Sequence, residues 1–211
     1  MVDADDLRDE WQSFSAEWIA RSEAKADAAR EGLLDDWMLE VIGDIDDRYV
    51  IDLGCGEGRF SRMLAARGAR TLGVDLQPSF VEYARNMAGP REDYRTGDIQ
   101  SLSEVSDGLF DLAVSYISLV DVPDQRAVIG EAFRVLSPGG RFVVCNLSPM
   151  ATAWIDGGPW CRNGDGEKQH FVLDHYANEG PRRLLFPSGH ELTNFHRMFS
   201  TTINDFLDAG F

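Results

Sequence analysis

The middle of the chain alternates short strand-like runs with amphipathic segments. Strand-like runs of about four to six residues suit a sheet, and segments whose apolar residues recur every three or four positions suit covering helices. Strands are expected at 50–53, 71–76, 93–96 and 110–115, a fifth after the turn at 138–140, and helices at 60–67, 79–87 and 124–136. This alternation implies helical crossovers between parallel strands. It predicts an α/β fold: a Rossmann-like, doubly wound, mostly parallel sheet with helices on both faces.

The first 47 residues form an acidic, helix-rich arm. Trp11, Phe14, Trp18 and Ile19 recur at the spacing of one helix face. A second helix is expected at 28–42, and its inward side is expected to hold Leu33, Leu34, Trp37, Met38 and Val41. The plainer interpretation of the aromatic residues in this arm is that they pack in the core.

A glycine-rich turn follows the first predicted strand. Gly54, Gly56 and Gly58 alternate between an apolar run and the start of an amphipathic helix. Glycine tolerates positive φ and, without a Cβ, lets backbone amides at a helix start approach a ligand closely. The turn is therefore a candidate binding site, and a tight turn that binds nothing is the alternative.

Polar residues also mark the ends of three later strands. Asp75 ends the second predicted strand, Asp98 follows the third, and Ser115 ends the fourth. The carboxyl ends of parallel strands meet at one edge of an open sheet, and α/β proteins bind their ligands there. We therefore expect these side chains to converge with Gly54 on one crevice. Either carboxylate could instead cap a following helix.

Four segments resemble, in order, the motifs of the class I S-adenosylmethionine-dependent methyltransferases, in the group that includes the ubiquinone and menaquinone biosynthesis methyltransferases. They are 50–60, 72–79, 97–102 and 131–140, and the resemblance spans 50–147. It implies S-adenosylmethionine as cofactor and S-adenosylhomocysteine as product. It also implies cofactor-binding roles for Asp52, Gly54, Cys55, Gly56, Asp75, Leu76, Asp98, Ile99 and Ser115.

The resemblance further implies what several of these residues contact. Asp52 and the amides of 54–56 would hold the amino-acid end of the cofactor. Asp75 would accept hydrogen bonds from both ribose hydroxyls in a charge-assisted, bidentate arrangement. Asp98 would accept from the adenine amino group, with Leu76 and Ile99 packed on the ring. The arm at 1–47 would close over the cofactor and exclude water.

The function implied is methyl transfer by direct displacement to an oxygen, nitrogen or carbon of a small or medium-sized organic acceptor. Tyr116 and His196 are the candidates for groups that face the acceptor or act as a general base. A sensor or assembly protein that binds S-adenosylmethionine without catalysis is one alternative. A dinucleotide-dependent enzyme is another, which Arg59 disfavours because the dinucleotide fingerprint places a small residue there.

The sequence divides into a helical arm or lid at 1–47, a cofactor-binding core at 48–147, a substrate-side insert at 148–199 and a C-terminal helix at 200–211. In the insert, 171–173 and 183–186 are expected to be two short strands joined to each other. Its aromatic residues line a pocket or form a small core of their own. The resemblance implies two further strands. Either the sequence ends before them, or the hairpin near 171–186 covers the edge of the fifth strand.

Composition narrows the choice of partners. The formal net charge is −16, and residues 1–47 hold 15 acidic against four basic residues. Without a basic run, a nucleic-acid partner is excluded. The three cysteines show no paired or metal-ligand spacing, and neither do the four histidines, so we expect no metal and a reduced, cytoplasmic protein. No apolar run is long enough to cross a bilayer and no leader is recognisable, so neither membrane insertion nor secretion is expected.

Overall fold

The computed structural model describes residues 4–155, 160–186 and 188–211. Its centre is a five-stranded sheet in the order β3-β2-β1-β4-β5, in which every neighbouring pair is parallel. The strands are β1 Tyr49–Leu53, β2 Arg70–Asp75, β3 Glu92–Thr96, β4 Phe110–Tyr116 and β5 Leu136–Cys145. The order in which strands are added to the sheet reverses between β1 and β4, at the centre of the sheet. The predicted doubly wound α/β fold is confirmed.

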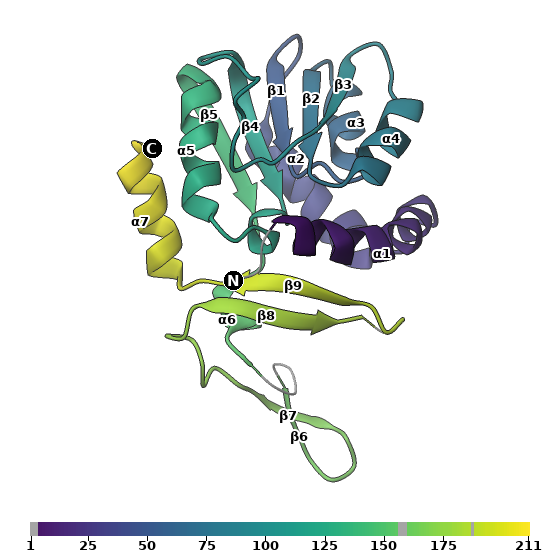
Figure 1. The fold of residues 1–211 in the computed structure, drawn as a ribbon, viewed down its shortest axis with the longest axis vertical. Coiled ribbons are helices and arrows are strands. Elements are labelled where there is room, and N and C mark those ends of the chain that lie inside the picture. Colours follow the sequence, from purple (N-terminus) through teal and green to yellow (C-terminus); the bar gives the residue numbers. More distant parts are fainter. Residues whose placement is uncertain (1–3, 156–159, 187) are drawn as a thin grey trace.

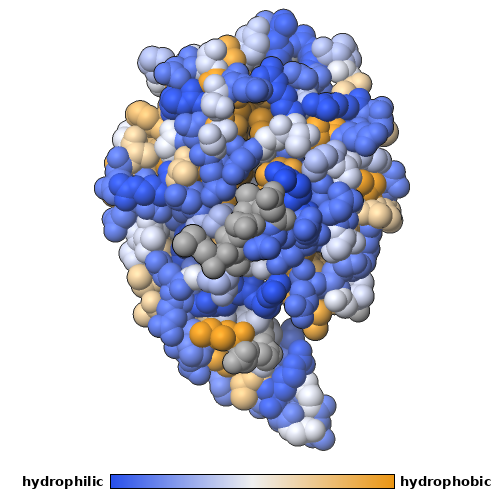
Figure 2. Space-filling model, viewed as in Figure 1, coloured by the Kyte–Doolittle hydropathy of each residue, from blue (hydrophilic) through white to orange (hydrophobic). Residues whose placement is uncertain are grey.

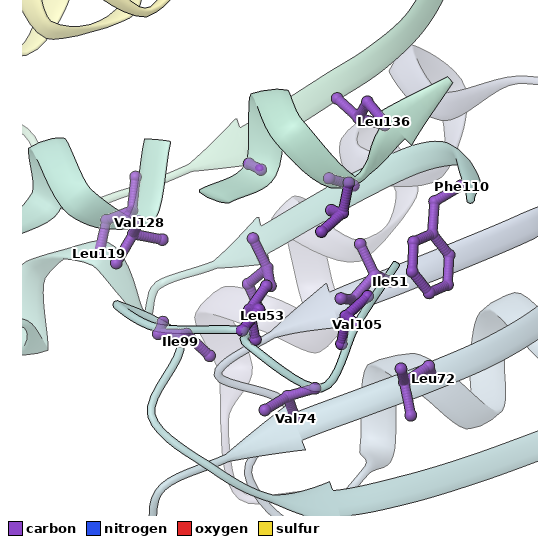
Figure 3. Packing of buried hydrophobic residues seen from close by; sticks show 14 residues of the cluster. Ile51, Leu53, Leu72, Val74, Ile99, Val105, Phe110, Leu119, Val128 and Leu136 are labelled. Atoms are coloured by element: carbon purple, nitrogen blue, oxygen red, sulfur yellow. The ribbon is translucent and has the colours of Figure 1, made fainter. Parts of the chain in front are cut away.

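The two faces of the sheet hold separate apolar clusters because successive strand residues point to opposite sides. Ile51 and Leu53 of β1 pack with Val128 of α5 (Gln125–Val135), and Figure 3 shows this cluster continuing to β2 through Val74. Val50, the residue before Ile51, belongs to the cluster on the other face. That face is covered by α2 (Asp35–Ile42) and α3 (Arg59–Ala65). Helix α4 (Pro78–Asn86) contacts β2 and β3.

The N-terminal arm contains α1 (Ala4–Glu23) and the short π-helix η1 (Arg30–Leu34), which leads directly into α2. Figure 1 shows α1 lying across the end of the sheet to which the strand arrows point. The expected inward side of the second helix is partly wrong. Met38 is buried, but Leu33, Trp37 and Val41 are 50%, 61% and 61% exposed. Two apolar stripes lie side by side on this segment, and only the one through Met38 faces the sheet.

The chain beyond β5 forms two separate hairpins. After α6 (Pro149–Thr152), β6 (Trp160–Arg162) pairs with β7 (Lys168–Phe171), and β8 (Gly180–Leu185) pairs with β9 (Glu191–His196), both antiparallel. The expected pairing of 171–173 with 183–186 is therefore wrong. Figure 1 shows the β8–β9 hairpin beside α1 and the β6–β7 hairpin projecting below it.

The free edge of β5 is not covered by either hairpin, contrary to one of the two expectations. Among the described residues β5 pairs only with β4, and each hairpin is a two-stranded sheet of its own. Helix α7 (Phe199–Ala209) follows β9 and packs along α5. Phe142 of β5 meets Phe206 of α7 with ring centroids 5.6 Å apart. Side-chain packing rather than strand pairing therefore flanks this side of the sheet.

The face of the molecule seen in Figure 2 is mainly polar. Figure 2 shows blue residues over most of the visible face, with apolar residues in small, separated groups. This appearance agrees with the formal net charge of −16. Among the described helices, none combines the length and the apolar character needed to span a bilayer.

Candidate functional site

The glycine turn between β1 and α3 folds back onto β2. The backbone N–H groups of Gly54 and Cys55 both donate to the carbonyl of Val74, at 2.8 and 3.1 Å. Gly54 has φ +77°, and a Cβ built there would lie 2.4 Å from the Cβ of Ser118. Gly56 also has positive φ (+55°), but a Cβ there would meet no atom within 4 Å. Packing therefore requires glycine at position 54, whereas Gly56 faces open space.

A cavity of about 380 Å³ lies against this turn at the carboxyl ends of the strands. Eight of the nine predicted cofactor-binding residues line it, and Tyr116 lines it as well. The eight are Asp52, Gly54, Cys55, Gly56, Asp75, Leu76, Asp98 and Ile99. The predicted convergence of strand ends on one crevice therefore holds for these residues. Their individual contacts with a cofactor stay predictions.

Asp75, at the end of β2, accepts two backbone hydrogen bonds. Its Oδ2 accepts from the Gly56 N–H at 2.8 Å, and its Oδ1 accepts from the Gln77 N–H at 2.9 Å. Burial raises the pKa of this carboxyl to about 6, although both N–H donors oppose the rise. Because a carboxylate has about four acceptor positions, two bound amides leave room for further donors from the cavity. Asp75 thus both orders the turn at 75–77 and faces the cavity.

Asp52 is the second buried carboxyl on the sheet side of the cavity. It is 1% exposed, and its Oδ2 accepts a hydrogen bond from the Ser61 hydroxyl at 2.6 Å. Burial raises the pKa of Asp52 to about 7, and the nearby charges of Asp75 and Glu57 add to the rise. A cationic ligand in the cavity would favour the ionised form of this carboxyl.

Asp98 lies beyond β3, beside the other edge of the cavity. Its Oδ1 accepts from the Gln100 N–H at 2.9 Å, and the Gln100 side-chain amide also donates to it. Ile99 is buried next to it in the main apolar cluster and Leu76 lies across the cavity wall. A carboxylate and two apolar side chains on one cavity suit a flat heterocycle with an exocyclic amino group, the part of the cofactor that the resemblance assigns to this segment.

Two predicted site residues lie outside the cavity lining. Ser115 is fully buried, and its hydroxyl bonds the Ser118 hydroxyl at 2.7 Å. His196 is also fully buried. Its Nε2 donates to the Tyr176 carbonyl at 2.9 Å, and its Nδ1 is hydrogen-bonded to the Thr152 hydroxyl at 2.7 Å. Both ring nitrogens of His196 are thus engaged in packing β9 on α6, away from the cavity.

Tyr116 lines the cavity, but its hydroxyl is already bonded. It donates to Oδ1 of Asp35 at 2.9 Å, and burial together with this carboxylate raises the pKa of the phenol above its ordinary value. A phenol that is held protonated in this way is a poor base near neutral pH. The structure therefore places Tyr116 at the cavity as a wall and a hydrogen-bond donor to Asp35.

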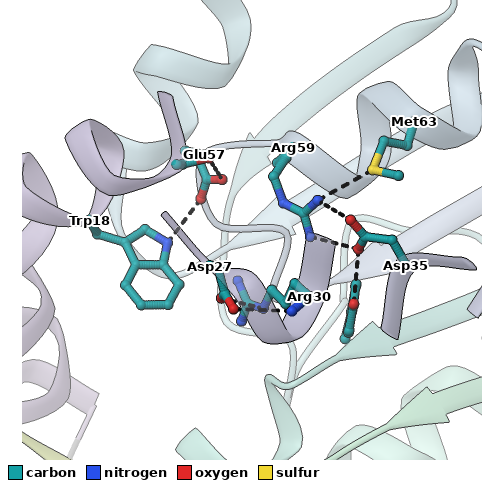
Figure 4. Close-up of polar contacts among 9 residues, drawn as sticks. Trp18, Asp27, Arg30, Asp35, Glu57, Arg59 and Met63 are labelled. Carbon is teal, nitrogen blue, oxygen red and sulfur yellow. Dashed lines mark hydrogen bonds and ion pairs between the residues drawn. The ribbon is translucent and has the colours of Figure 1, made fainter. Parts of the chain in front are cut away.

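Arg59 begins α3 and closes the side of the cavity next to α2. Its two terminal nitrogens donate to the two carboxylate oxygens of Asp35 at 2.7 and 2.9 Å, as Figure 4 shows. Arg30 of η1 lies close by, with its guanidinium 5.1 Å from the Trp18 ring centroid and 5.4 Å from that of Tyr116. The long side chain at position 59 therefore reaches the N-terminal arm. A dinucleotide fingerprint has a small residue at this position, so this turn differs from that fingerprint.

The arm and the second hairpin form the cover of the cavity. Trp18 and Ser22 of α1 donate to the two oxygens of Glu57 at 3.0 and 2.7 Å. Glu10 of α1 accepts from the backbone N–H and the hydroxyl of Thr193 on β9, at 2.8 and 2.9 Å. These contacts join α1 to the glycine turn on one side and to the β8–β9 hairpin on the other.

Sequence reasoning missed several cavity residues. They include Arg30, Gln77, Asp121 and Asn194, together with Trp11 and Trp18, for which core packing was the plainer interpretation. Asp121 ends the short helix η2 (Leu119–Asp121), which follows β4. Its position after a strand end was the available signal. No local pattern places Asn194 of β9 opposite it.

Asp121 is held by the second hairpin. The Asn194 side-chain amide donates to its Oδ1 at 2.5 Å. Burial raises the pKa of Asp121 to about 7; the Asn194 hydrogen bond and the Arg30 charge oppose this rise, and the Asp75 charge adds to it. In the described part of the chain, no group of three or more His, Cys, Asp or Glu side chains is arranged to hold a metal ion.

Comparison with known proteins adds a family to this geometry. Residues 51–144 match the family model described as a methyltransferase domain. Two curated relatives, both ubiquinone biosynthesis O-methyltransferases, are 31% identical. The one from Bordetella avium matches over 68% of this chain and 62% of its own length, and the one from Idiomarina loihiensis over 59% and 56%. The chain thus spans about three fifths of the length of these relatives.

Solved structures agree in the fold. A putative S-adenosylmethionine-dependent methyltransferase from Listeria monocytogenes superposes with a TM-score of 0.75 at 27% identity, covering 87% of this chain and 81% of its own. An S-adenosylmethionine-dependent methyltransferase from Mesorhizobium loti gives a TM-score of 0.73 at 29% identity, with 83% and 80% covered. The similarity to these structures extends well beyond the segment matched by the family model.

Proposed function

Because the chain belongs to the class I S-adenosylmethionine-dependent methyltransferases, we propose that its cavity binds S-adenosylmethionine and that the protein transfers the methyl group to a small or medium-sized organic acceptor. The observation that carries this proposal is the pair of buried carboxyls, Asp52 and Asp75, which line the cavity and form no ion pair with any described residue. Such carboxyls suit a ligand that brings hydroxyl donors and positive charge.

The residues present fit the parts of this cofactor. The cofactor carries a sulfonium, an ammonium, a carboxylate and an adenosine. Asp75 would take the ribose hydroxyls, Asp98 the adenine amino group, and Asp52 with the amides of 54–56 the amino-acid end. Ser115 would act only from below the cavity wall, through Ser118, because its hydroxyl is buried against that side chain. When bound, the cofactor supplies a methyl group on a sulfonium that is already activated.

The chain itself then contributes by holding the two reactants in position and by excluding water. Orienting two reactants in line is worth up to about 7 to 11 kcal/mol in favourable systems. We propose that the arm at 1–47 acts as the lid and that 148–199 forms the acceptor side, over a core at 48–147. Leu7 and Trp11 of α1 and Leu184 and Leu192 of the hairpin line the cavity, which supports this division.

The size and charge of the site favour a small acceptor. The cavity lies between the sheet and the cover formed by α1 and the β8–β9 hairpin, and an acidic surface repels nucleic acid. The names of the two curated relatives point to methyl transfer onto oxygen of a small molecule in those proteins. An acceptor of that general kind is consistent with a cavity of about 380 Å³.

Transfer of a labelled methyl group tests this function. The protein is incubated with S-adenosylmethionine labelled in the methyl group and a protein-free extract of bacterial small molecules. We expect a labelled small product from the native protein and from Asp208→Asn, which removes an exposed carboxylate on α7, and none from Asp75→Asn. Binding of S-adenosylhomocysteine without any labelled product would instead favour a sensor or assembly protein that binds the cofactor without catalysis.

A further inference from the structure

Asp121 is a cavity carboxyl for which the cofactor assignment has no use. It lies at the end of η2, which follows β4, and lines the cavity. Its Oδ1 accepts from Asn194, and no described donor reaches its Oδ2. The side chain lines the cavity, so Oδ2 is the carboxylate oxygen that a ligand in the cavity can reach.

The segment that carries Asp121 is fixed from both sides. On the sheet side, the Ser118 hydroxyl donates to the Leu53 carbonyl of β1, and the Asp121 N–H donates to the Ser118 carbonyl at 3.0 Å. On the cover side, the guanidinium of Arg197, just after β9, donates to the carbonyls of Leu119, Val122 and Pro123. Asp121 therefore has a defined position relative to the cavity, as a group that exchanges a proton with a substrate must have.

The burial of Asp121 and the charged groups that face it bring the pKa of its carboxyl close to neutral pH. These charged groups are Arg30 of η1 and Asp75 of β2, with the neutral amide of Asn194 on β9 in direct contact. Burial outweighs Arg30 and Asn194, and the pKa rises to about 7. A carboxyl of this kind can accept a proton near neutral pH and release it again to solvent.

The other candidate bases are occupied. The Tyr116 hydroxyl is bound to Asp35, and both nitrogens of His196 are bonded outside the cavity. Apolar and aromatic residues line the same cavity, among them Val120, Ile117 and Tyr116. A flat ring that bears a hydroxyl group suits such a lining, with the hydroxyl directed at Oδ2 of Asp121.

We infer that Asp121 is the general base of this site, held in position by Asn194, and that the acceptor is an aromatic hydroxyl compound. This inference rests on the proposed function. The hydroxyl proton passes to Oδ2 of Asp121. An electron pair of the acceptor oxygen forms the new bond to the methyl carbon, and the pair of the broken carbon–sulfur bond stays on sulfur. Asp121 then returns the proton to solvent.

Binding of 4-nitrocatechol to the complex with S-adenosylhomocysteine tests the inference. The probe is coloured when ionised. When the ionised probe binds beside Asp121, one proton is held between the probe oxygen and the carboxylate. We expect the native complex to take up close to one proton per probe bound near pH 8, measured by calorimetry in two buffers. Asp121→Asn abolishes this uptake and weakens probe binding at least tenfold, with unchanged affinity for S-adenosylhomocysteine. Asp208→Asn serves as the control and behaves like the native protein.

Asn194→Ala provides a second measurement that a purely structural role would not move. Removing its hydrogen bond raises the pKa of Asp121 further, so the pH midpoint of proton uptake shifts upward while uptake persists. If Asp121→Asn is too unstable for the measurement, Asn194→Ala still tests the inference. Failure of the probe to bind, or equal uptake in Asp121→Asn, overturns the inference. A tenfold loss of S-adenosylhomocysteine affinity in Asp121→Asn also overturns it, since Asp121 would then hold the cofactor. No binding of S-adenosylhomocysteine to the native protein overturns the proposed function and this inference together.

Discussion

The two walls of the cavity are built differently. On the sheet side, backbone N–H groups of the strand-end turns hold the carboxyls: those of Gln77 and Gly56 bind Asp75, and that of Gln100 binds Asp98. On the cover side, the polar contacts join residues far apart: Glu10 to Thr193, and Asp121 to Asn194. A local turn forms with the strand that ends in it, whereas the cover exists only when α1 and the β8–β9 hairpin meet over the sheet.

This difference suggests separate roles for the two walls. The sheet side is part of the main apolar core and shares the stability of the whole domain. The cover is held by a few polar contacts and by aromatic packing such as Phe14 on Phe186, with ring centroids 4.5 Å apart. Elements held by few contacts open at lower free energy than the core. We therefore expect the cover to open more readily than the sheet side.

The largest effect should come from Gly54→Ala on the sheet side. An alanine there takes a positive φ, and its Cβ would lie 2.4 Å from that of Ser118. Backbone strain and overpacking together should lower the free energy of unfolding by about 2 to 5 kcal/mol, as measured by urea unfolding. Gly56→Ala is the matched control, because it carries the strain without the clash and should cost about 1 to 2 kcal/mol. Equal losses in both variants would contradict the packing explanation.

An intermediate effect is expected from Glu10→Ala on the cover. The variant removes acceptors for Thr193 and for Arg183, which donates to Glu10 at 2.9 Å. Hydrogen exchange should become faster in α1 and in 191–196, and affinity for S-adenosylhomocysteine should fall about tenfold, which corresponds to about 1.4 kcal/mol. The unfolding midpoint of the core should hardly change. Glu40→Ala, at an exposed position on α2, is the control. Unchanged exchange in α1 would show that Glu10 does not hold the cover.

The smallest expected effect is the pH dependence of stability, to which carboxyls of both walls contribute. Burial raises the pKa of Asp52 and Asp121 to about 7 and that of Asp75 to about 6, against 3.8 ordinarily. Between pH 4 and 7 the folded state therefore binds more protons than the unfolded state, so these groups make stability fall as pH rises. We expect at least about 1 kcal/mol less unfolding free energy at pH 8 than at pH 5.5, measured with urea.

Asp121→Asn sharpens this pH comparison. Because it removes one of the three raised carboxyls, it should flatten the fall in stability between pH 5.5 and 8. Asp208→Asn, at the surface, should leave the slope as it is. A native stability that rises from pH 5.5 to 8 would contradict the burial of these carboxyls.

The sequence predicts the sheet side well because its signals are local. Each strand end and the glycine turn are recognised within a few residues, Asp75 follows the turn by about twenty residues, and eight of the nine predicted cofactor-binding residues line the cavity. Ser115 is the exception. Its side chain lies below the turn, because only alternate residues of a strand point to one face.

The cover could not be predicted in the same way. Helical periodicity finds apolar stripes, but it does not say whether Met38 or Trp37 faces the sheet when the two stripes are adjacent. The hairpin partners of 171–173 and 183–186 depend on register across long loops, and short strands carry little register information. His196 looked like a catalytic histidine from its residue type alone. Its burial between Thr152 and Tyr176 follows from the packing of β9 on α6, which no nearby residue indicates.

Calorimetric titration of S-adenosylhomocysteine into the native protein and into Asp75→Asn tests the central claim most directly, because Asp75 lies where the glycine turn, β2 and the cavity meet. Asp93→Asn, an exposed change on β3, is the control, and thermal unfolding of all three proteins verifies that they are folded. We predict one site per chain in the native protein and in the control, and at least tenfold weaker binding in Asp75→Asn. Equal affinity in all three folded proteins, or no heat in any of them, would contradict the account.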